Sequence, residues 1–329
     1  MKKAMIMAAG VGTRLNPLTL TIPKPLVTIA NRPVMDLVFE NLKKYRVKNV
    51  IANTYYMAEQ ITSRYQKNDF GIKFSSIKEE TLSGTAGGLK KCQHFFKEGE
   101  NFFVLSGDGL SDINLNKLFE QHILSGAIAT IAVKEVEKEL VNNFGVAVTN
   151  QNGLITEFQE KPEIENAKSN LVNTGIYVFN YKIFDYIPEN EFYDFAKNVF
   201  PKLIDEKSIY AYKLEEYWSD IGTTEQYIKS NFDAISGEIS INHSPIMKMD
   251  LGAYISDSTV PTFGCLGKVI IGKNCKIGKN VVLENTIIGN DVIIKDNVTL
   301  INCLVTNGCK ITSNMTNQIV SPEKSLSFV

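Results

Sequence analysis

Two glycine-rich stretches and a few scattered charged residues could do chemistry in this chain. The first apolar run leads directly into Ala9-Gly10-Val11-Gly12-Thr13-Arg14. Glycines here let the backbone approach a ligand closely and turn its N–H groups toward phosphate oxygens, and Arg14 adds a planar donor fork. The stretch lacks the Gly-Lys-Ser/Thr of the ATPase phosphate loop, and Leu15 stands where the dinucleotide fingerprint needs its third glycine. A phosphate-binding turn is therefore expected, with a plain tight turn as the alternative.

A lysine bracketed by prolines follows this loop. Pro23 and Pro25 flank Lys24, and their rings should restrict its backbone to extended conformations. A lysine fixed in this way can hold its ammonium over a phosphate. Without the glycine loop upstream, a solvent-facing loop lysine would be the simpler interpretation.

Two aspartates far apart in the sequence are candidate metal ligands. Asp108 follows an apolar run and Gly107, whereas Asp220 follows Trp218. Magnesium prefers oxygen ligands and keeps several waters, so one or two carboxylates plus substrate phosphates suffice to bind it. Taken alone, each aspartate is more typical of a turn or a helix cap. Asp112, for example, could cap a helix over residues 114–125.

Strand-like and helix-like segments alternate up to about residue 235. This alternation predicts a Rossmann-like α/β domain whose mostly parallel sheet has helices on both faces. Ligands bind outside the carboxyl ends of such strands, where Gly10 and Asp108 are expected to lie. The expected strands are Met5–Ala9, Asn49–Thr54, Phe102–Leu105, Ala129–Val133 and Gly175–Phe179, and the expected helices are Asp36–Tyr45, Ala58–Gln66, Leu89–Phe95, Asn116–Ser125 and Thr224–Ile235.

From about residue 253 the period changes. An aliphatic residue recurs about every six positions, as at Ile271, Ile277, Ile288 and Ile294, and glycine often follows it. This hexapeptide repeat predicts a left-handed β-helix in which the recurring aliphatic side chains stack inside. The expected domains are a catalytic domain over residues 1–235, a connector over 236–252, and the β-helix with a polar tail over 253–329.

Composition excludes several other classes. Of the 329 residues 44% are hydrophobic and 22% charged, and the net charge is −1, so neither nucleic acid nor a membrane is an expected partner. No run approaches the roughly 18 apolar residues of a membrane span. The 5 cysteines form no CxxC pair, which favours free buried thiols in a reducing cytoplasm over disulfides or a zinc site.

Taken in order, these motifs resemble the signature of the sugar-1-phosphate nucleotidyltransferases. The resemblance implies transfer of a nucleoside monophosphate from a triphosphate to a sugar 1-phosphate, with release of pyrophosphate. It also implies dependence on Mg²⁺, with Asp108 and Asp220 as the ligands. The segments that carry it are Gly10–Thr19, Pro23–Leu26, Leu105–Asp108, Phe144–Val146, Glu160–Pro162, Asn173–Tyr177 and Trp218–Thr223.

The resemblance also implies a role for each site residue. Arg14 would meet the departing pyrophosphate, Lys24 the phosphates at the reacting centre, and Lys161 the sugar phosphate. Because the attacking phosphate oxygen is already an anion, no general base is needed, and the 3 histidines lie outside every motif. The implied nucleotide-binding residues are Ala9, Gly10, Gly12, Thr13, Arg14, Gly84 and Thr85, and the implied sugar-phosphate-binding residues are Gly145, Glu160, Lys161, Asn173 and Thr174.

The choice of base and sugar rests on the second glycine cluster. The sequence Gly84-Thr-Ala-Gly87 resembles mannose-1-phosphate guanylyltransferases more than thymidylyltransferases. GTP and mannose 1-phosphate are therefore the expected substrates, although one or two hydrogen bonds can decide base choice. Glucose 1-phosphate with UTP, dTTP or ATP stays open.

Two other classes compete with the enzyme interpretation. A non-catalytic regulatory homologue is disfavoured because every catalytic group is present. A hexapeptide acyltransferase is disfavoured because no histidine follows His243. The stacked coils offer surfaces for association, so a homo-oligomer, either dimer or tetramer, is expected.

Overall fold

The computed structural model describes residues 2–67, 70–241, 247–248, 253–256, 258, 264–323 and 325–327. The chain divides into two compact units. The first comprises Met1–Gly12, Ile22–Leu26 and Val34–Asp220, and the second comprises Thr13–Thr21, Val27–Pro33 and Ile221–Val329. Most of the expected connector at 236–252 lies outside the described residues, so the predicted domain boundaries stay predictions.

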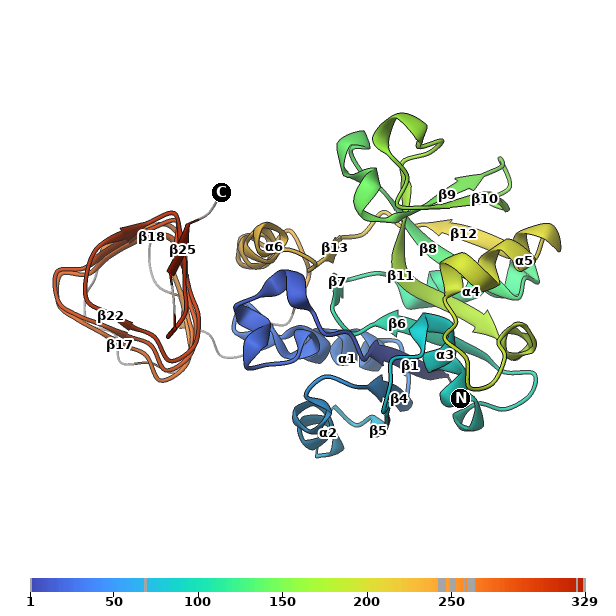
Figure 1. Cartoon of the computed structure of the whole chain (residues 1–329), viewed down its shortest axis with the longest axis horizontal. Helices are drawn as coiled ribbons and strands as arrows, with labels where there is room; N and C mark the ends of the chain where they lie inside the picture. Colours follow the sequence, from blue (N-terminus) through green and yellow to red (C-terminus); the bar gives the residue numbers. More distant parts are fainter. Residues whose placement is uncertain are drawn as a thin grey trace. The chain divides into compact units, whose positions relative to one another are not determined.

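A single large sheet organises the first unit (Figure 1). Its strand order is β10-β9-β11-β6-β1-β4-β5, with β8 pairing β11 and β12. The strands next to β1 are parallel to it, while β11 runs antiparallel to β6, β8 and β9. The bounds are β1 Lys3–Ala8, β4 Asn49–Thr54, β5 Lys73–Lys78, β6 Asn101–Ser106, β8 Ala129–Glu135, β9 Gly145–Thr149, β10 Ile155–Glu160, β11 Leu171–Asn180 and β12 Ile209–Lys213.

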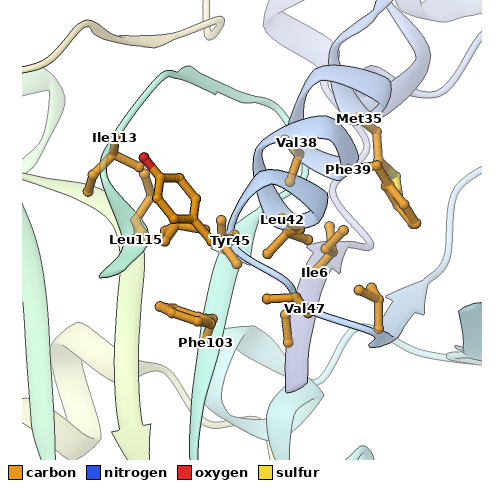
Figure 2. Packing of buried hydrophobic residues seen from close by; sticks show 14 of the residues in the cluster. Ile6, Met35, Val38, Phe39, Leu42, Tyr45, Val47, Phe103, Ile113 and Leu115 are labelled. Carbon is orange, nitrogen blue, oxygen red and sulfur yellow. The ribbon is translucent and has the colours of Figure 1, made fainter. Parts of the chain in front are cut away.

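Both faces of this sheet are buried. Successive side chains of a strand point to opposite faces, and β1 accordingly places Ile6 in one apolar cluster and Met5 in another. Figure 2 shows Phe39 and Leu42 of one helix in the cluster that also contains Ile6. The predicted α/β sheet covered on both faces is confirmed. The helices of this unit are α1 Val34–Lys44, α2 Ala58–Gln66, α3 Gly84–Lys91, α4 Leu115–Ser125 and α5 Phe200–Asp205.

Three helix starts differ from the expectation, with α1 beginning at Val34 rather than Asp36. Helix α3 begins at Gly84 rather than Leu89, because the carbonyl of Tyr193 accepts hydrogen bonds from the N–H groups of both Ala86 and Gly87 at 3.0 Å. The cap of α4 is Asn114, whose Oδ1 accepts from the N–H groups of the first turn. Asp112 instead accepts from the N–H of Tyr217 at 3.0 Å, so its expected capping role is wrong.

Short parallel strands form a coil in the second unit. Ile277, Ile294 and Ile311 lie opposite one another on neighbouring turns and are buried in one cluster. The predicted β-helix is thereby confirmed, and the cysteines are all free and buried. The coil strands are β15 Ala253–Ile255, β16 Gly264–Ile271, β17 Lys276–Ile277, β18 Val282–Ile288, β19 Ile293–Ile294, β20 Thr299–Ile301, β21 Leu304–Val305, β22 Lys310–Ile311, β23 Met315–Thr316 and β24 Gln318–Val320, with β14 Met247–Lys248 and β25 Ser325–Ser327 at the ends.

The middle turns of this coil advance 17 residues, as the hydrogen bonds from Asn274 to Asp291 and from Asn280 to Asn297 show. These four residues have φ between 55° and 61°, a left-handed conformation that asparagine and aspartate tolerate well. The left-handed backbone at the corners of the coil therefore accounts for the asparagines and aspartates there. Burial inside the coil accounts for the aliphatic residues along its strands.

The same unit contains α6, Thr224–Ser236, and a hairpin of β2, Thr28–Ile29, with β3, Arg32–Pro33. The hydroxyl of Thr223 caps α6 by accepting from the N–H of Gln226 at 3.3 Å. Among the described residues, no helix combines the length and the apolar character that crossing a membrane requires.

Candidate active site

A two-stranded ribbon brings the two candidate aspartates together. Strand β7, Gly109–Ser111, pairs antiparallel with β13, Trp218–Asp220, so that Asp220 lies opposite Gly109. Asp108 directly precedes β7 and therefore adjoins Asp220. This pairing joins residues from distant parts of the chain, and it gives the site its acidic side.

Lys24 lies between the two carboxylates. Its ammonium forms an ion pair with Asp108 and lies 3.6 Å from Oδ1 of Asp220. The side chains are 11%, 21% and 30% exposed for Lys24, Asp108 and Asp220. Burial by itself would raise the pKa of Asp108, but the Lys24 ammonium and the Ser106 hydroxyl hold it below its ordinary value. Asp108 is thus an ionised carboxylate at neutral pH.

The backbone of Lys24 differs from the expectation. It begins a 3₁₀ turn, Lys24–Leu26, closed by a hydrogen bond of 2.8 Å from the N–H of Leu26 to the carbonyl of Pro23. Pro25 fits inside this turn because the single hydrogen bond does not use its missing N–H. The predicted extended conformation is therefore wrong, although Lys24 is held in place.

Glycine at position 107 allows the aspartate loop to lie against β1. Its N–H donates to the carbonyl of Met7 at 2.9 Å. A Cβ at Gly107 would lie only 3.0 Å from that oxygen and 3.1 Å from a methyl of Ile6. Asp108 thereby follows directly after a segment packed on the strand that leads to Ala9 and Gly10.

The glycine loop has an open backbone. Among the described residues, apart from its two chain neighbours, none places an atom within 4 Å of the position that a Cβ of Gly10 would take, and Gly12 has a φ of 74° that favours glycine. Ala9 is 7% exposed. Thr13 and Arg14 begin a 3₁₀ turn in the second unit, and both are exposed.

Three of the candidate sugar-phosphate-binding residues lie on the β9–β10 hairpin or directly after it. Gly145 lies opposite Glu160, and a Cβ there would meet the ring of Phe158 at 2.5 Å and Oε2 of Glu160 at 3.1 Å. Burial, together with the charge of Asp194, raises the pKa of Glu160. Lys161 comes next with a φ of 48°. The hairpin requires glycine at 145 and presents Lys161 just after the strand.

Asn173 and Thr174 lie at an irregular point of β11. Asn173 accepts from the N–H of Gly175 at 3.0 Å and donates to the hydroxyl of Tyr177 at 3.0 Å. Thr174 is 3% exposed and donates to the carbonyl of Ala132 at 2.7 Å. The hydroxyl of Thr174 is thus used inside the fold.

Trp218 connects these segments to the acidic ribbon. Its indole N–H donates to the carbonyl of Thr174 at 3.0 Å. Its ring packs against Phe144 with centroids 5.4 Å apart. Because Asp220 lies two residues further along β13, one side chain places both sugar segments beside the strand that carries a candidate metal ligand.

The second glycine cluster is fixed by its neighbours. Gly84 has a φ of 78°, and a Cβ there would lie 2.4 Å from the carbonyl oxygen of Tyr193. The Thr85 hydroxyl donates to Asp194 at 2.8 Å and accepts from the N–H of Phe195 at 2.9 Å. The Thr85 hydroxyl is therefore already used to fix this turn against the segment at Asp194 and Phe195.

Sequence reasoning missed the polar residues beneath this turn. Asn53, Glu79 and Lys91 form a hydrogen-bonded group there. Asn53 lies near the end of β4, and Glu79 directly follows β5. A polar residue ending an apolar strand was the one available signal, and it is weak because such residues are usually solvated.

The carboxylates of Asp108 and Asp220 suit a magnesium ion whose remaining ligands are substrate phosphates and waters. In the parts of the chain that the structure describes, no three histidine, cysteine or acidic side chains gather as a ready-made metal cage. Asp108 and Asp220 nevertheless converge on one cation, the Lys24 ammonium. Two carboxylates facing a common point are sufficient for magnesium when phosphates and waters complete its shell.

Comparisons with known proteins agree with this arrangement. The family described as Nucleotidyl transferase matches residues 3–236, and that described as GMPPB C-terminal domain matches residues 235–320. A UTP–glucose-1-phosphate uridylyltransferase of Synechocystis is 36% identical, covering 86% of this chain and 82% of the relative. Mannose-1-phosphate guanyltransferase beta-B of Xenopus laevis is 31% identical, covering 84% and 73%.

Solved structures support the fold. A UDP-glucose pyrophosphorylase from Acinetobacter baumanii superposes with a TM-score of 0.65 at 22% identity, covering 72% of this chain and 94% of that one. The family match extends over most of the chain and includes every segment of the candidate site. The chain therefore belongs to the nucleotidyl transferase family and is an enzyme of the sugar-1-phosphate nucleotidyltransferase class.

Proposed function

We propose that this enzyme transfers GMP from GTP to mannose 1-phosphate, giving GDP-mannose and pyrophosphate. The observation that carries the proposal is the ion-paired group of Lys24, Asp108 and Asp220. The choice of base and sugar is supported by the Gly84-Thr-Ala-Gly87 segment that opens α3 and by the match of residues 235–320 to the GMPPB C-terminal domain.

A second candidate reaction is transfer of UMP from UTP to glucose 1-phosphate. The Synechocystis relative, which carries that name, is 36% identical over most of both chains. Both reactions use the same phosphate chemistry. They differ only in contacts to the base and the sugar, where one or two hydrogen bonds can decide.

The reaction needs charge neutralisation more than proton transfer. The sugar-phosphate oxygen attacks the α-phosphorus, and pyrophosphate leaves. Since the nucleophile is already an anion, the barrier comes from bringing several negative groups together. Asp108 and Asp220 would hold Mg²⁺, which supplies positive charge to the phosphate oxygens when it is bound. Lys24 would then donate to phosphates at the reacting centre.

The remaining residues bind and orient the substrates. Ala9, Gly10, Gly12 and Thr13 would offer backbone N–H groups to the triphosphate, and Arg14 would donate to the departing pyrophosphate. Gly84 and Thr85 would border the base through their backbone.

On the sugar side, Lys161 would pair with the phosphate of the sugar 1-phosphate. Gly145, Glu160 and Asn173 would contact the sugar hydroxyls. Thr174 would contribute through its backbone, because its hydroxyl already donates to Ala132. These roles use groups at the ends of β9 and β10 and at the irregular point of β11.

A matrix of substrates tests the proposed specificity. Purified protein with Mg²⁺ is given GTP, UTP, dTTP or ATP together with mannose 1-phosphate or glucose 1-phosphate, and pyrophosphate release is measured. We expect the highest kcat/KM for GTP with mannose 1-phosphate. A higher value for UTP with glucose 1-phosphate would establish the second candidate, and no release with any pair would refute both.

A paired substitution tests the role of Asp108. Asp108→Asn removes one charge beside Lys24 and should abolish turnover with little effect on folding. Asp112→Asn is the matched control, because the side-chain amide oxygen of the asparagine can still accept from the N–H of Tyr217. This variant should turn over normally. Near-normal activity of Asp108→Asn at saturating Mg²⁺ would remove Asp108 from the mechanism.

A further inference from the structure

A buried carboxylate lies outside the proposed catalytic group. Glu79 is 2% exposed. Its Oε1 accepts from Nδ2 of Asn53 at 2.6 Å. Its Oε2 accepts from the N–H of Ser83 at 3.1 Å, from the Ser83 hydroxyl, and from the Lys91 ammonium at 2.9 Å. Both oxygens are therefore used, and each faces donors only.

These contacts keep Glu79 charged. Burial by itself would raise the pKa of Glu79, but the hydrogen bonds from Ser83, Asn53 and Lys91 outweigh it and hold the pKa below the ordinary value. An ionised carboxylate accepts on both oxygens and donates nowhere. No other side chain type of this size satisfies the same set of donors.

The hydrogen bonds of Glu79 reach two separate segments. On one side, Asn53 links Glu79 to β1, because the Oδ1 of Asn53 accepts from the N–H of Ala8 at 3.3 Å. Ala8 is the last residue of β1 and directly precedes Ala9 and Gly10. On the other side, Ser83 directly precedes Gly84, where α3 begins.

Helix α3 packs closely against the side chains of Asn53 and Glu79. A Cβ at Gly88 of α3 would lie 2.5 Å from Nδ2 of Asn53 and 3.3 Å from Oε1 of Glu79. The first turns of α3 thus lie directly on the Asn53–Glu79 pair. A change in the position of this pair must move either α3 or the end of β1.

We propose that Glu79 is a positioning residue for the nucleotide, holding the Ala9–Gly10 and Ser83–Gly84 segments at the spacing at which both contact one nucleoside triphosphate. The inference rests on the proposed function, in which these two segments bind the triphosphate. Because both oxygens of Glu79 already accept from protein donors, its action runs through Asn53 and Ser83. Its effect should therefore fall on triphosphate binding and spare the sugar phosphate.

Glu79→Gln tests the proposal with a side chain of the same shape. A glutamine amide has one acceptor oxygen and one donor nitrogen, so its NH₂ must face either Asn53 or the Ser83 and Lys91 donors. Residue 79 then loses its hydrogen bond either to Asn53, which contacts the end of β1, or to Ser83, which precedes α3. Because small misplacements of binding groups have large effects, we expect KM for the triphosphate to rise about tenfold and KM for the sugar phosphate to stay within about twofold.

Asp36→Asn is a matched control. Asp36 is 6% exposed and accepts from Nε of Arg64 at 3.0 Å and the hydroxyl of Tyr65 at 2.7 Å. This substitution damages another ion pair with a buried carboxylate, which connects α1 and α2. Both variants should melt at a lower temperature, but only Glu79→Gln should change KM for the triphosphate selectively.

A milder variant covers the case in which Glu79→Gln does not fold. Ser83→Ala removes one donor to Glu79 and keeps the N–H donor, so KM for the triphosphate should rise about threefold. The assay uses whichever triphosphate the substrate matrix selects. Equal changes in both KM values, a change in kcat alone, or the same KM pattern for Asp36→Asn would each overturn the proposal.

Calorimetric titration separates this proposal from the proposed function. Triphosphate with Mg²⁺ is titrated into wild type, Glu79→Gln and Asp36→Asn without sugar phosphate. Weaker binding to Glu79→Gln alone supports the positioning role even if no pyrophosphate is released. Unchanged binding to Glu79→Gln overturns the role even if the wild-type enzyme turns over as proposed.

Discussion

Replacing Lys24 with methionine should destabilise the protein when no divalent ion is present. Methionine keeps most of the length of the side chain but removes the ammonium between Asp108 and Asp220. Removing one partner of a fully buried pair costs about 3–5 kcal/mol, whereas exposed pairs contribute about 0–1 kcal/mol. With side chains 11%, 21% and 30% exposed, this group lies between those limits, and we expect a loss of about 2 kcal/mol.

Magnesium should restore most of that loss. Without Lys24 the two carboxylates repel each other, and a divalent ion bound between them removes the repulsion. In the wild type a divalent ion must first displace the Lys24 ammonium from its ion pair, so the same concentration stabilises less. By calorimetry we expect Lys24→Met to melt about 4–8 °C below wild type without Mg²⁺ and to gain more than wild type when Mg²⁺ is added.

An exposed lysine provides the control for this experiment. Lys78 pairs with Glu59, and their side chains are 61% and 75% exposed. Lys78→Met should change the melting temperature by no more than about 2 °C and should show the wild-type response to Mg²⁺. If Lys24→Met is as stable as wild type without Mg²⁺, or responds to Mg²⁺ no more than wild type, the two carboxylates do not share one cation site.

Three further predictions follow from other parts of the chain. Burial lowers the pKa of His122 to about 4, while in the unfolded chain it is about 6.5. The unfolded state therefore binds the extra proton first, and stability should fall by about 2 kcal/mol between pH 7 and pH 5; urea unfolding at the two pH values measures this loss, which should shrink in His122→Gln. Lys161→Ala should raise KM for the sugar phosphate several-fold, and a change confined to KM for the triphosphate would contradict its assigned role. Removing the residues after 240 should change the number of subunits that light scattering gives, and an unchanged number would exclude the coil from the association.

Elements that follow one regular period could be predicted from the sequence. The apolar run that forms β1 and the aliphatic repeat through Ile277 and Ile294 both reflect burial, which the order of residues records directly. Helix starts were harder to predict, because Asp112 and Asn114 are both good caps and only the local turn decides between them.

The assembly of the site could not be predicted from residue types alone. Asp108 and Asp220 become neighbours through the antiparallel pairing of β7 with β13, which no local pattern encodes. The resemblance to a family indicated the two aspartates, but it did not indicate that Lys24 lies between them. Glu79 carried no motif at all, since its importance depends on donors that come from β4 and α3.

The charges at the centre of the site constrain how the substrates must arrive. One ammonium and two carboxylates, those of Lys24, Asp108 and Asp220, leave the group with a net charge of −1. That charge repels a bare phosphate, so a sugar phosphate gains little by approaching first. A triphosphate that carries its own divalent ion changes the sign, because two further positive charges give a net charge of +1 before the phosphates are counted. We infer that the nucleotide binds before the sugar phosphate, and initial-rate patterns in which the sugar phosphate binds the free enzyme first would contradict this order.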